Sequence, residues 1–197
     1  MKVKEMLALI ANRLSNLSIN TNTDIILPYL NMGVSELYRR YGLSVREEVI
    51  PTCAAKRLYE LHNDDVLFLY SVYDSSGKEI PQLDTYDDRG LHYKQVNYRS
   101  FLLTESFEGM VYCIYKAAPE RLEDENDEID VPDPMLDVLE NYVTYKVLSI
   151  LNGDQLQGQE TLTYRQITEQ LMRDLDSQGY GAMAQTERFS LHRKGFV

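Results

Sequence analysis

The spacing of apolar residues changes twice along this chain of 197 residues, and that change constrains the fold more than any other feature. In residues 3–17 and 26–41 apolar side chains recur every three or four positions, the repeat of one face of an amphipathic helix. Between residues 43 and 116 they recur about every second position in short clusters, which is typical of strands. The helical spacing returns after residue 134. The sequence therefore predicts an α+β fold in which a β-rich segment is inserted between two helical halves.

Two helices are predicted before the insertion. The first covers residues 3–17, with apolar side chains at Val3, Met6, Leu7, Leu9, Ile10, Leu14 and Leu17. The second has Asn22 or Thr23 as its cap and Gly42 as its end, and its apolar stripe consists of Ile26, Leu30, Val34, Leu37, Tyr38 and Tyr41. Because proline lacks the N–H that a helix interior needs, the regular part is expected to begin close to Pro28.

Two more helices are predicted after the insertion. The third begins at Pro134, ends at Asn152-Gly153, and carries its stripe at Met135, Val138, Leu139, Tyr142, Val143, Lys146, Val147, Ile150 and Leu151. The fourth runs from about Glu160 to Asp176, with a stripe at Leu162, Ile167, Leu171 and Leu175. Because each stripe must be covered, we expect the four helices to share one core.

The inserted segment is expected to form about five to seven antiparallel strands, closed into a small sandwich or open barrel. Turn-like sequences at residues 75–78 and 87–90 support this meander. Many of the fifteen tyrosines lie here, and tyrosine suits half-buried strands as well as protein interfaces. The predicted organisation is a helical domain (1–42 and 134–178), an inserted β domain (43–118), an acidic linker (119–133) and a C-terminal tail (179–197).

The acidic linker carries eight acids between Glu120 and Asp133 against the single Arg121. Such a segment is solvated and mobile unless a partner holds it. The run from Asp124 to Asp130 superficially resembles a calcium loop, but it lacks the glycine at the sixth position and the glutamate at the twelfth. A solvated linker is therefore favoured over calcium or magnesium binding.

The net charge of −11 argues against a general nucleic-acid binder, because affinity for phosphates needs a basic face. A local basic patch can still contact DNA. No apolar run approaches the roughly 20 residues that cross a bilayer, and polar residues interrupt the first 18 positions. Neither membrane insertion nor secretion is expected.

No catalytic, cofactor-binding or metal-binding residues are assigned, because no nucleophile, phosphate-binding or metal motif is present. The histidines, His62, His92 and His192, are isolated, which argues against structural zinc. A disulfide between Cys53 and Cys113 is allowed by their number, but both lie in apolar strand-like sequence, where reduced cysteine is favoured. Paired carboxylates of a hydrolase need no sequence motif, so that class stays open.

The tail combines cations with large apolar residues and holds three glycines. Its candidate docking residues are Arg188, Phe189, Leu191, His192, Arg193, Lys194 and Phe196. We favour a segment that becomes ordered on a partner over a frayed end. His192 is interpreted as a surface contact, with a ligand or pH-switch role as the alternative.

The order of these parts resembles the head-to-tail adaptor proteins of tailed bacteriophages, also called connector, ring or tail tubular A proteins. The resemblance rests on residues 27–38 (LPYLNMGVSELY), on Val131-Pro132-Asp133-Pro134 before the third helix, and on residues 142–148 (YVTYKVL) within it. The sequence lacks tryptophan, whereas the family motif often has an aromatic residue early in the second helix, a place left to Ile26 or Tyr29.

The resemblance implies a four-helix core with an inserted β domain, no enzymatic activity and no cofactor. It implies a ring of roughly twelve copies in the virion neck, assembled in the host cytoplasm. Its partners would be the portal protein, reached by the C-terminal part, and the next tail component, a nozzle or tail tube, faced by the β domain. Genome DNA would pass through without specific binding. The alternatives are an α+β enzyme or regulatory protein of unknown chemistry, and a free-standing protein-binding module.

Overall fold

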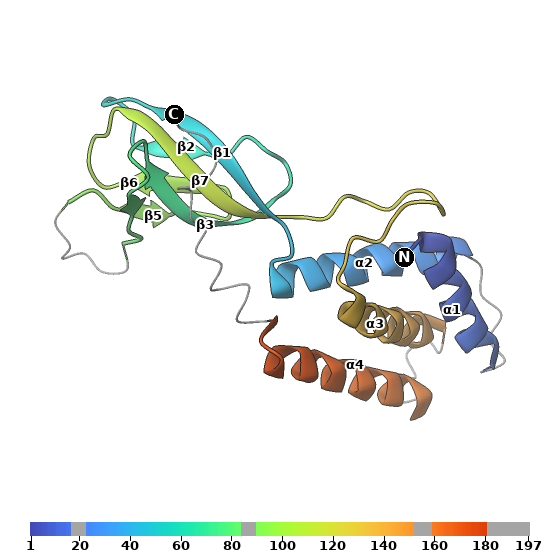
Figure 1. The fold of residues 1–197 in the computed structure, drawn as a ribbon. Coiled ribbons are helices and arrows are strands. Elements are labelled where there is room, and N and C mark those ends of the chain that lie inside the picture. The colour runs from blue at the N-terminus through green and yellow to red at the C-terminus, as the bar shows by residue number, and fades with distance from the viewer. Residues whose placement is uncertain (17–22, 84–89, 152–158, 181–197) are drawn as a thin grey trace. The chain divides into compact units, whose positions relative to one another are not determined.

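The computed structural model describes residues 1–16, 23–83, 90–151 and 159–180. These residues divide into two compact units, a helical unit (1–41 and 119–180) and a β unit (42–118) that interrupts it in sequence. Each unit has its own elements in Figure 1. The predicted α+β fold, with a β insertion between helical halves, is confirmed.

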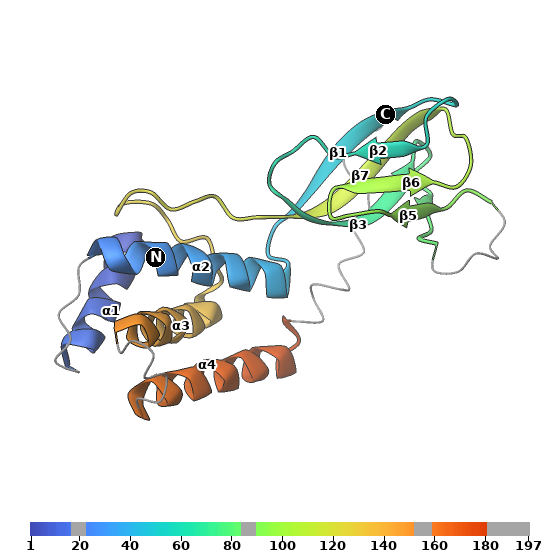
Figure 2. The same ribbon diagram turned by 180° about the vertical axis from the view of Figure 1, so that it is seen from behind.

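The helical unit contains α1 (Val3–Asn16), α2 (Thr23–Tyr41), α3 (Asp133–Leu151) and α4 (Gln159–Ser177). Helix α3 contacts all three other helices, and α1 also contacts α2. Both views place α3 between α2 and α4 (Figures 1 and 2). The central position explains why α3 buries the largest set of side chains, namely Met135, Val138, Leu139, Asn141, Val143, Thr144, Val147 and Leu148. The expectation of one shared helical core is confirmed.

Both ends of α2 bear on the sequence expectations. Gly42 has φ of 58°, a left-handed conformation that ends the helix after Tyr41 as predicted. The expectation that the regular helix begins near Pro28 is wrong, because α2 begins at Thr23. Ile26 lies in the turns before the proline and is only 1% exposed. Burial of this side chain offsets the N–H that Pro28 cannot donate.

The apolar stripe predicted for α4 is also partly wrong. Leu175 is buried as expected, but Leu162 and Ile167 are 42% and 38% exposed. The buried positions are instead Thr161, Thr168 and Leu175, which recur every seven residues. Seven residues are close to two helical turns, so these side chains lie in one narrow line along α4, a helix that packs on α3. The pattern of apolar residues did not predict this line, because two of its three side chains are threonines.

The expectation of a solvated linker at residues 119–133, here called the acidic segment, is wrong as well. It belongs to the helical unit and buries Leu122 and Ile129 to 7% and 3% exposure. Its Ile129 N–H donates to Met1 O at 2.9 Å, next to an antiparallel bridge between Lys2 and Glu128. The segment is held by this chain itself, because its backbone finds partners on α1 and α2 and its two apolar residues find cover.

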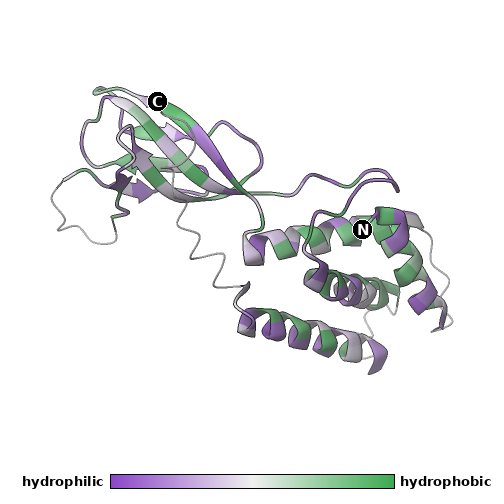
Figure 3. Cartoon of the chain, viewed as in Figure 1, coloured by the Kyte–Doolittle hydropathy of each residue, from purple (hydrophilic) through white to green (hydrophobic). Residues whose placement is uncertain are grey.

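The described residues of the β unit form seven strands in two antiparallel sheets, within the predicted number. One sheet has the order β1-β7-β3-β4, from β1 (Val45–Thr52), β7 (Gly109–Ala117), β3 (Val66–Asp74) and β4 (Glu79–Ile80). The other has the order β2-β6-β5, from β2 (Leu58–Glu60), β6 (Ser100–Leu103) and β5 (Tyr93–Gln95). Inner residues of both sheets, among them Val72, Cys113 and Phe101, form one apolar cluster. The alternation along the strands is visible in Figure 3.

The predicted turn at residues 75–78 joins β3 to β4. Asp74 N–H donates to Lys78 O at 2.9 Å, and Gly77 takes the positive φ of 78° that the tight turn requires. Other predicted boundaries, the turn at 87–90 for its first three residues and the Asn152-Gly153 helix stop, lie outside the described residues. The third helix is described as far as Leu151.

Candidate functional site

The residues that the sequence singles out for docking lie outside the described part of the chain. The structure describes the chain as far as Tyr180, and the seven candidates fall beyond it: Arg188, Phe189, Leu191, His192, Arg193, Lys194 and Phe196. Their docking role therefore stays a prediction.

Cysteine and histidine form no metal centre in residues 1–16, 23–83, 90–151 and 159–180, where no group of three or more His, Cys, Asp or Glu could hold an ion. Cys53 is exposed, Cys113 is buried, and both are free thiols, as the sequence favoured. Burial raises the pKa of the Cys113 thiol, which keeps it protonated and a poor nucleophile. His92 is buried, and its ring Nδ1 lies 3.0 Å from Gly90 O.

The motif in α2 that carries the resemblance has a structural role. Asn31 binds the backbone of Leu122 on both sides: its Oδ1 accepts from Leu122 N–H at 2.8 Å, and its Nδ2 donates to Leu122 O at 2.9 Å. Seven residues further along the helix, Tyr38 OH donates to Asp130 O at 2.7 Å. The two side chains thereby fasten the two ends of the acidic segment to α2.

The middle of the acidic segment is fastened to α1. The N–H groups of Val3 and Lys4, in the first turn of that helix, donate to Asp127 O at 3.0 Å and Glu125 O at 2.8 Å. The first N–H groups of a helix have no partner within it, so these carbonyls satisfy donors that would otherwise lack one. A segment of net negative charge is also favourable near a helix N-terminus.

The carboxylates of the calcium-like run are used within the segment. Asp127 Oδ2 accepts from the N–H groups of Asp124 at 2.9 Å and Glu123 at 2.8 Å, and these bonds lower the pKa of Asp127. Asp124 Oδ1 accepts from both N–H and Nδ2 of Asn126. The side chains of Glu123, Glu125 and Glu128 remain exposed. The result is an ordered, acidic edge of the helical unit.

Gly33, in the same motif, allows α2 and α3 to approach closely. A Cβ at this position would lie 2.5 Å from Leu139 Cδ1 and 3.1 Å from Tyr142 Cδ1. The motif thus combines a glycine for helix packing with two polar anchors for the acidic segment. Sequence reasoning used Asn31 and Gly33 only for the resemblance, and it placed Tyr38 also in the apolar stripe of the second helix. The available signal was the placement of Asn31 and Tyr38 seven residues apart on one helix face.

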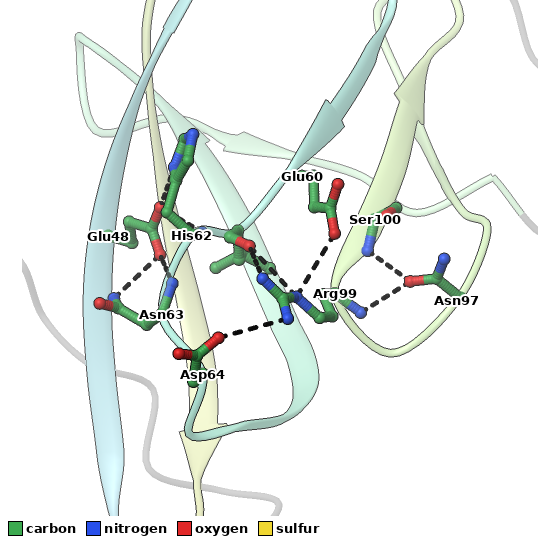
Figure 4. A network of polar contacts seen from close by, with 9 residues as sticks. Glu48, Glu60, His62, Asn63, Asp64, Asn97, Arg99 and Ser100 are labelled. Atoms are coloured by element: carbon green, nitrogen blue, oxygen red, sulfur yellow. Dashed lines mark hydrogen bonds and ion pairs between the residues drawn. The ribbon is translucent and has the colours of Figure 1, made fainter.

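A polar network orders the β2–β3 connection in the β unit (Figure 4). Glu48 Oε1 accepts from His62 N–H at 2.8 Å and lies 2.7 Å from its ring Nδ1, while Glu48 Oε2 accepts from Asn63 Nδ2 at 2.9 Å. Partial burial raises the pKa of Glu48, but the bonds from His62 and Asn63 outweigh it, and the net pKa lies below its usual value. On the other side of the loop, Arg99 donates to Leu61 O at 3.0 Å.

The surface of the described residues has open hollows, two of which are candidates for ligand binding. One, of about 660 Å³, is lined by Asp74, Lys78, Glu79, Ile80, Pro81, Gln82, Gly90, Leu91 and His92. The other, of about 400 Å³, is lined by Asp24, Leu27, Pro28, Asn31, Arg121, Leu122 and Glu123. Asp74 and Asn31 already bond neighbouring backbone within these linings, so their polar groups serve the fold. We assign no ligand to either hollow.

Among the described residues, no helix has the length and apolar character needed to cross a membrane.

Comparison with known proteins identifies the family. The family model of the SU10 adaptor protein matches residues 1–190, nearly the whole chain. No curated protein matches. Among solved structures, the chain is similar to one from the neck of an empty GTA particle computed with C6 symmetry, at 11% identity and a TM-score of 0.26, covering 64% of this chain and 67% of that one. The match over residues 1–190 shows that the chain belongs to the SU10 adaptor protein family.

Proposed function

We propose that this chain is a structural virion protein, a head-to-tail adaptor that forms a ring between the portal and the next tail component and continues the DNA channel. The observation that carries the proposal is the family match over residues 1–190. In this role the protein is no enzyme and needs no cofactor, and its place is the neck of the virion.

The charge of the chain suits a channel. With a net charge of −11, and the exposed carboxylates of the ordered acidic segment, a ring of these subunits repels the phosphates of a passing genome. DNA slides through such a channel because no counterion release favours a bound state. Binding to free duplex DNA at physiological salt is therefore expected to be weak and independent of sequence.

The two units suit contacts with two different partners. Each has its own hydrophobic core, so each can present a rigid surface. We assign the C-terminal part of the chain to the portal and the β unit to the next tail component, which would be a nozzle or a tail tube. About twelve copies would close the ring, by rotation through one repeated contact.

The C-terminal tail, residues 179–197, is proposed to dock on the portal. This segment has three cations and one glutamate in a chain of net charge −11, together with the large apolar side chains of Phe189, Leu191 and Phe196. Each apolar side chain buried in a groove contributes about 1.5–3 kcal/mol before ordering costs are subtracted. Many weak tails in one ring act as one strong attachment, because engagement of the first raises the effective concentration of the rest.

The function is tested with heads of the encoding phage that were made without this protein. Purified chain is added to the DNA-filled heads, and the particles are imaged by electron microscopy and assayed for retained DNA. We expect a ring of density below the portal and retention of DNA. Heads that stay bare at high adaptor concentration, while the purified chain is folded, contradict the proposal.

Docking by the tail is tested with a chain that ends after Tyr180. We expect this truncation to leave the melting temperature nearly unchanged and to abolish retention on heads. A full-length variant with Arg188, Arg193 and Lys194 changed to Ser separates the ionic contribution from the apolar one. A truncated chain that still joins heads and yields infectious particles places portal attachment elsewhere, on α3 and α4.

A further inference from the structure

The β unit has two outer faces that point away from each other. The two sheets face one another across a single apolar cluster, which contains Ile50, Val72 and Val111 from one sheet and Tyr59, Phe101 and Leu103 from the other. Side chains alternate along a strand, so the residues between these positions lie on the outer faces. The register between strands then places them in rows across each sheet.

One row crosses the outer face of the four-stranded sheet. Val49 in β1 pairs with Tyr112 in β7, Tyr112 pairs with Tyr73 in β3, and Tyr73 pairs with Glu79 in β4. Val49 is 44% exposed, the two tyrosines are partly exposed, and Glu79 is exposed at the edge strand. This row, the β1–β4 row, consists of three apolar or aromatic side chains followed by a carboxylate.

A second row crosses the outer face of the three-stranded sheet. Leu58 in β2 pairs with Leu102 in β6, and Leu102 pairs with Lys94 in β5. Leu58 is 49% exposed, Leu102 is partly exposed, and Lys94 is exposed at the edge strand. This row, the β2–β5 row, consists of two aliphatic side chains followed by an ammonium group.

The two rows therefore have the same order of apolar and charged side chains and carry charges of opposite sign. Each begins with apolar side chains and ends, on an edge strand, with one charge, negative in the β1–β4 row and positive in the β2–β5 row. Single exposed apolar residues are ordinary on a protein surface, whereas apolar side chains that adjoin one another form a patch of the kind that marks a contact with a partner.

We infer that neighbouring copies of this chain contact each other through these faces, with the β1–β4 row of one copy against the β2–β5 row of the next. The inference rests on the proposed ring. A closed ring needs a heterologous contact, made by two different patches on each subunit, and two opposite faces of one sandwich supply them. Copies that each carry a net charge of −11 repel one another, so a lateral contact also needs a local attraction such as Glu79 with Lys94.

The experiment uses two charge reversals in the full chain, Glu79→Lys and Lys94→Glu. Each variant alone brings like charges together at every contact, and we expect it to lose the assembled species both on adaptor-free heads and in concentrated solution, as measured by sedimentation. In an equal mixture, alternating E79K and K94E copies pair opposite charges at every contact. The mixture and the double variant E79K/K94E are therefore expected to recover assembly.

Matched controls carry the same charge changes away from both rows. Glu105→Lys lies in the exposed loop after β6, and Lys4→Glu lies on the exposed side of α1. Both are expected to assemble as the wild type does. Zero-length cross-linking of isotope-labelled with unlabelled wild-type copies should join Glu79 of one copy to Lys94 of another.

The outcomes distinguish this contact from the proposed function. Wild-type chain that joins heads, with both single variants joining equally well, contradicts the contact and leaves the adaptor role intact. If the wild-type chain assembles in concentrated solution and gives the Glu79–Lys94 cross-link but never joins heads, this result supports the contact and contradicts the adaptor role. Wild-type chain that assembles in neither setting contradicts both.

Discussion

Replacing Gly33 with alanine tests how closely α2 and α3 pack, because helix propensity and packing predict opposite signs for the change in the free energy of unfolding. In an exposed helix interior, Gly→Ala stabilises by about 1 kcal/mol. Here the new Cβ would lie 2.5 Å from Leu139 Cδ1, well inside the roughly 3.5–4.0 Å of an ordinary carbon contact. Leu139 is fully buried, so it cannot turn away without displacing its neighbours.

The two contributions can be compared in magnitude. Overpacking of a buried site costs about 1–3 kcal/mol, and the propensity gain offsets about 1 kcal/mol of it. We expect Gly33→Ala to lower the free energy of unfolding by about 1 kcal/mol. The matched control is Ser35→Ala, at an exposed position of the same helix, which is expected to raise it by up to about 0.5 kcal/mol.

The measurement is urea denaturation followed by far-ultraviolet circular dichroism, which reports on the helical unit. The midpoint should fall for Gly33→Ala with an unchanged m-value. In a Leu139→Ala background, which itself costs about 2–5 kcal/mol, the added methyl group meets a cavity and its cost should disappear. The close approach of these helices would be refuted if Gly33→Ala stabilised the wild type. It would also be refuted if the losses in the free energy of unfolding caused by Gly33→Ala and Leu139→Ala added in the double variant.

Three further predictions concern the rest of the described chain. Glu48→Gln should lower the free energy of unfolding of the β unit by about 1–3 kcal/mol. Because the pKa of Glu48 is lowered in the folded chain, its carboxylate stabilises the fold fully at a pH above the usual pKa of 4.5, and this stabilisation is lost as the pH falls further. The free energies of unfolding of the wild type and the variant should therefore converge in acid. Leu175→Ala should lower the free energy of unfolding, measured from the denaturant midpoint, by about 2–5 kcal/mol, and Ile167→Ala should lower it by only about 0.5 kcal/mol. Equal losses would instead support the apolar stripe predicted from the sequence. Maleimide labelling with mass spectrometry should modify Cys53 in the folded chain and Cys113 only after unfolding.

The acidic segment shows how a motif can support function through structure. Asn31 and Tyr38 bond backbone groups of Leu122 and Asp130, and the side chains of Glu123, Glu125 and Glu128 between these two anchors are exposed. Loss of either anchor would release part of the segment, although the buried Ile129 would still hold its end. In the proposed ring, the order of this segment fixes where negative charge is displayed.

The sequence by itself determined the alternation of helices and strands, because hydrophobic spacing reports directly on which face of an element is covered. It also placed the end of α2, since Gly42 takes a left-handed conformation at low cost. The insertion of a β unit into a helical unit followed from the two changes of spacing. The family resemblance followed from the motif in residues 27–38 together with the order of the elements.

Only the tertiary structure decided how these parts are held together. Proline inside α2 is tolerated because Ile26, in the turns before it, is buried in the folded chain. Helix α4 buries Thr161 and Thr168, which no hydrophobic pattern marks. The acidic segment has the composition of a solvated linker, yet it is ordered by Asn31, whose partner Leu122 lies 91 positions along the chain. Composition predicts what a segment does in water, whereas hydrogen bonds to a distant helix are set by the fold.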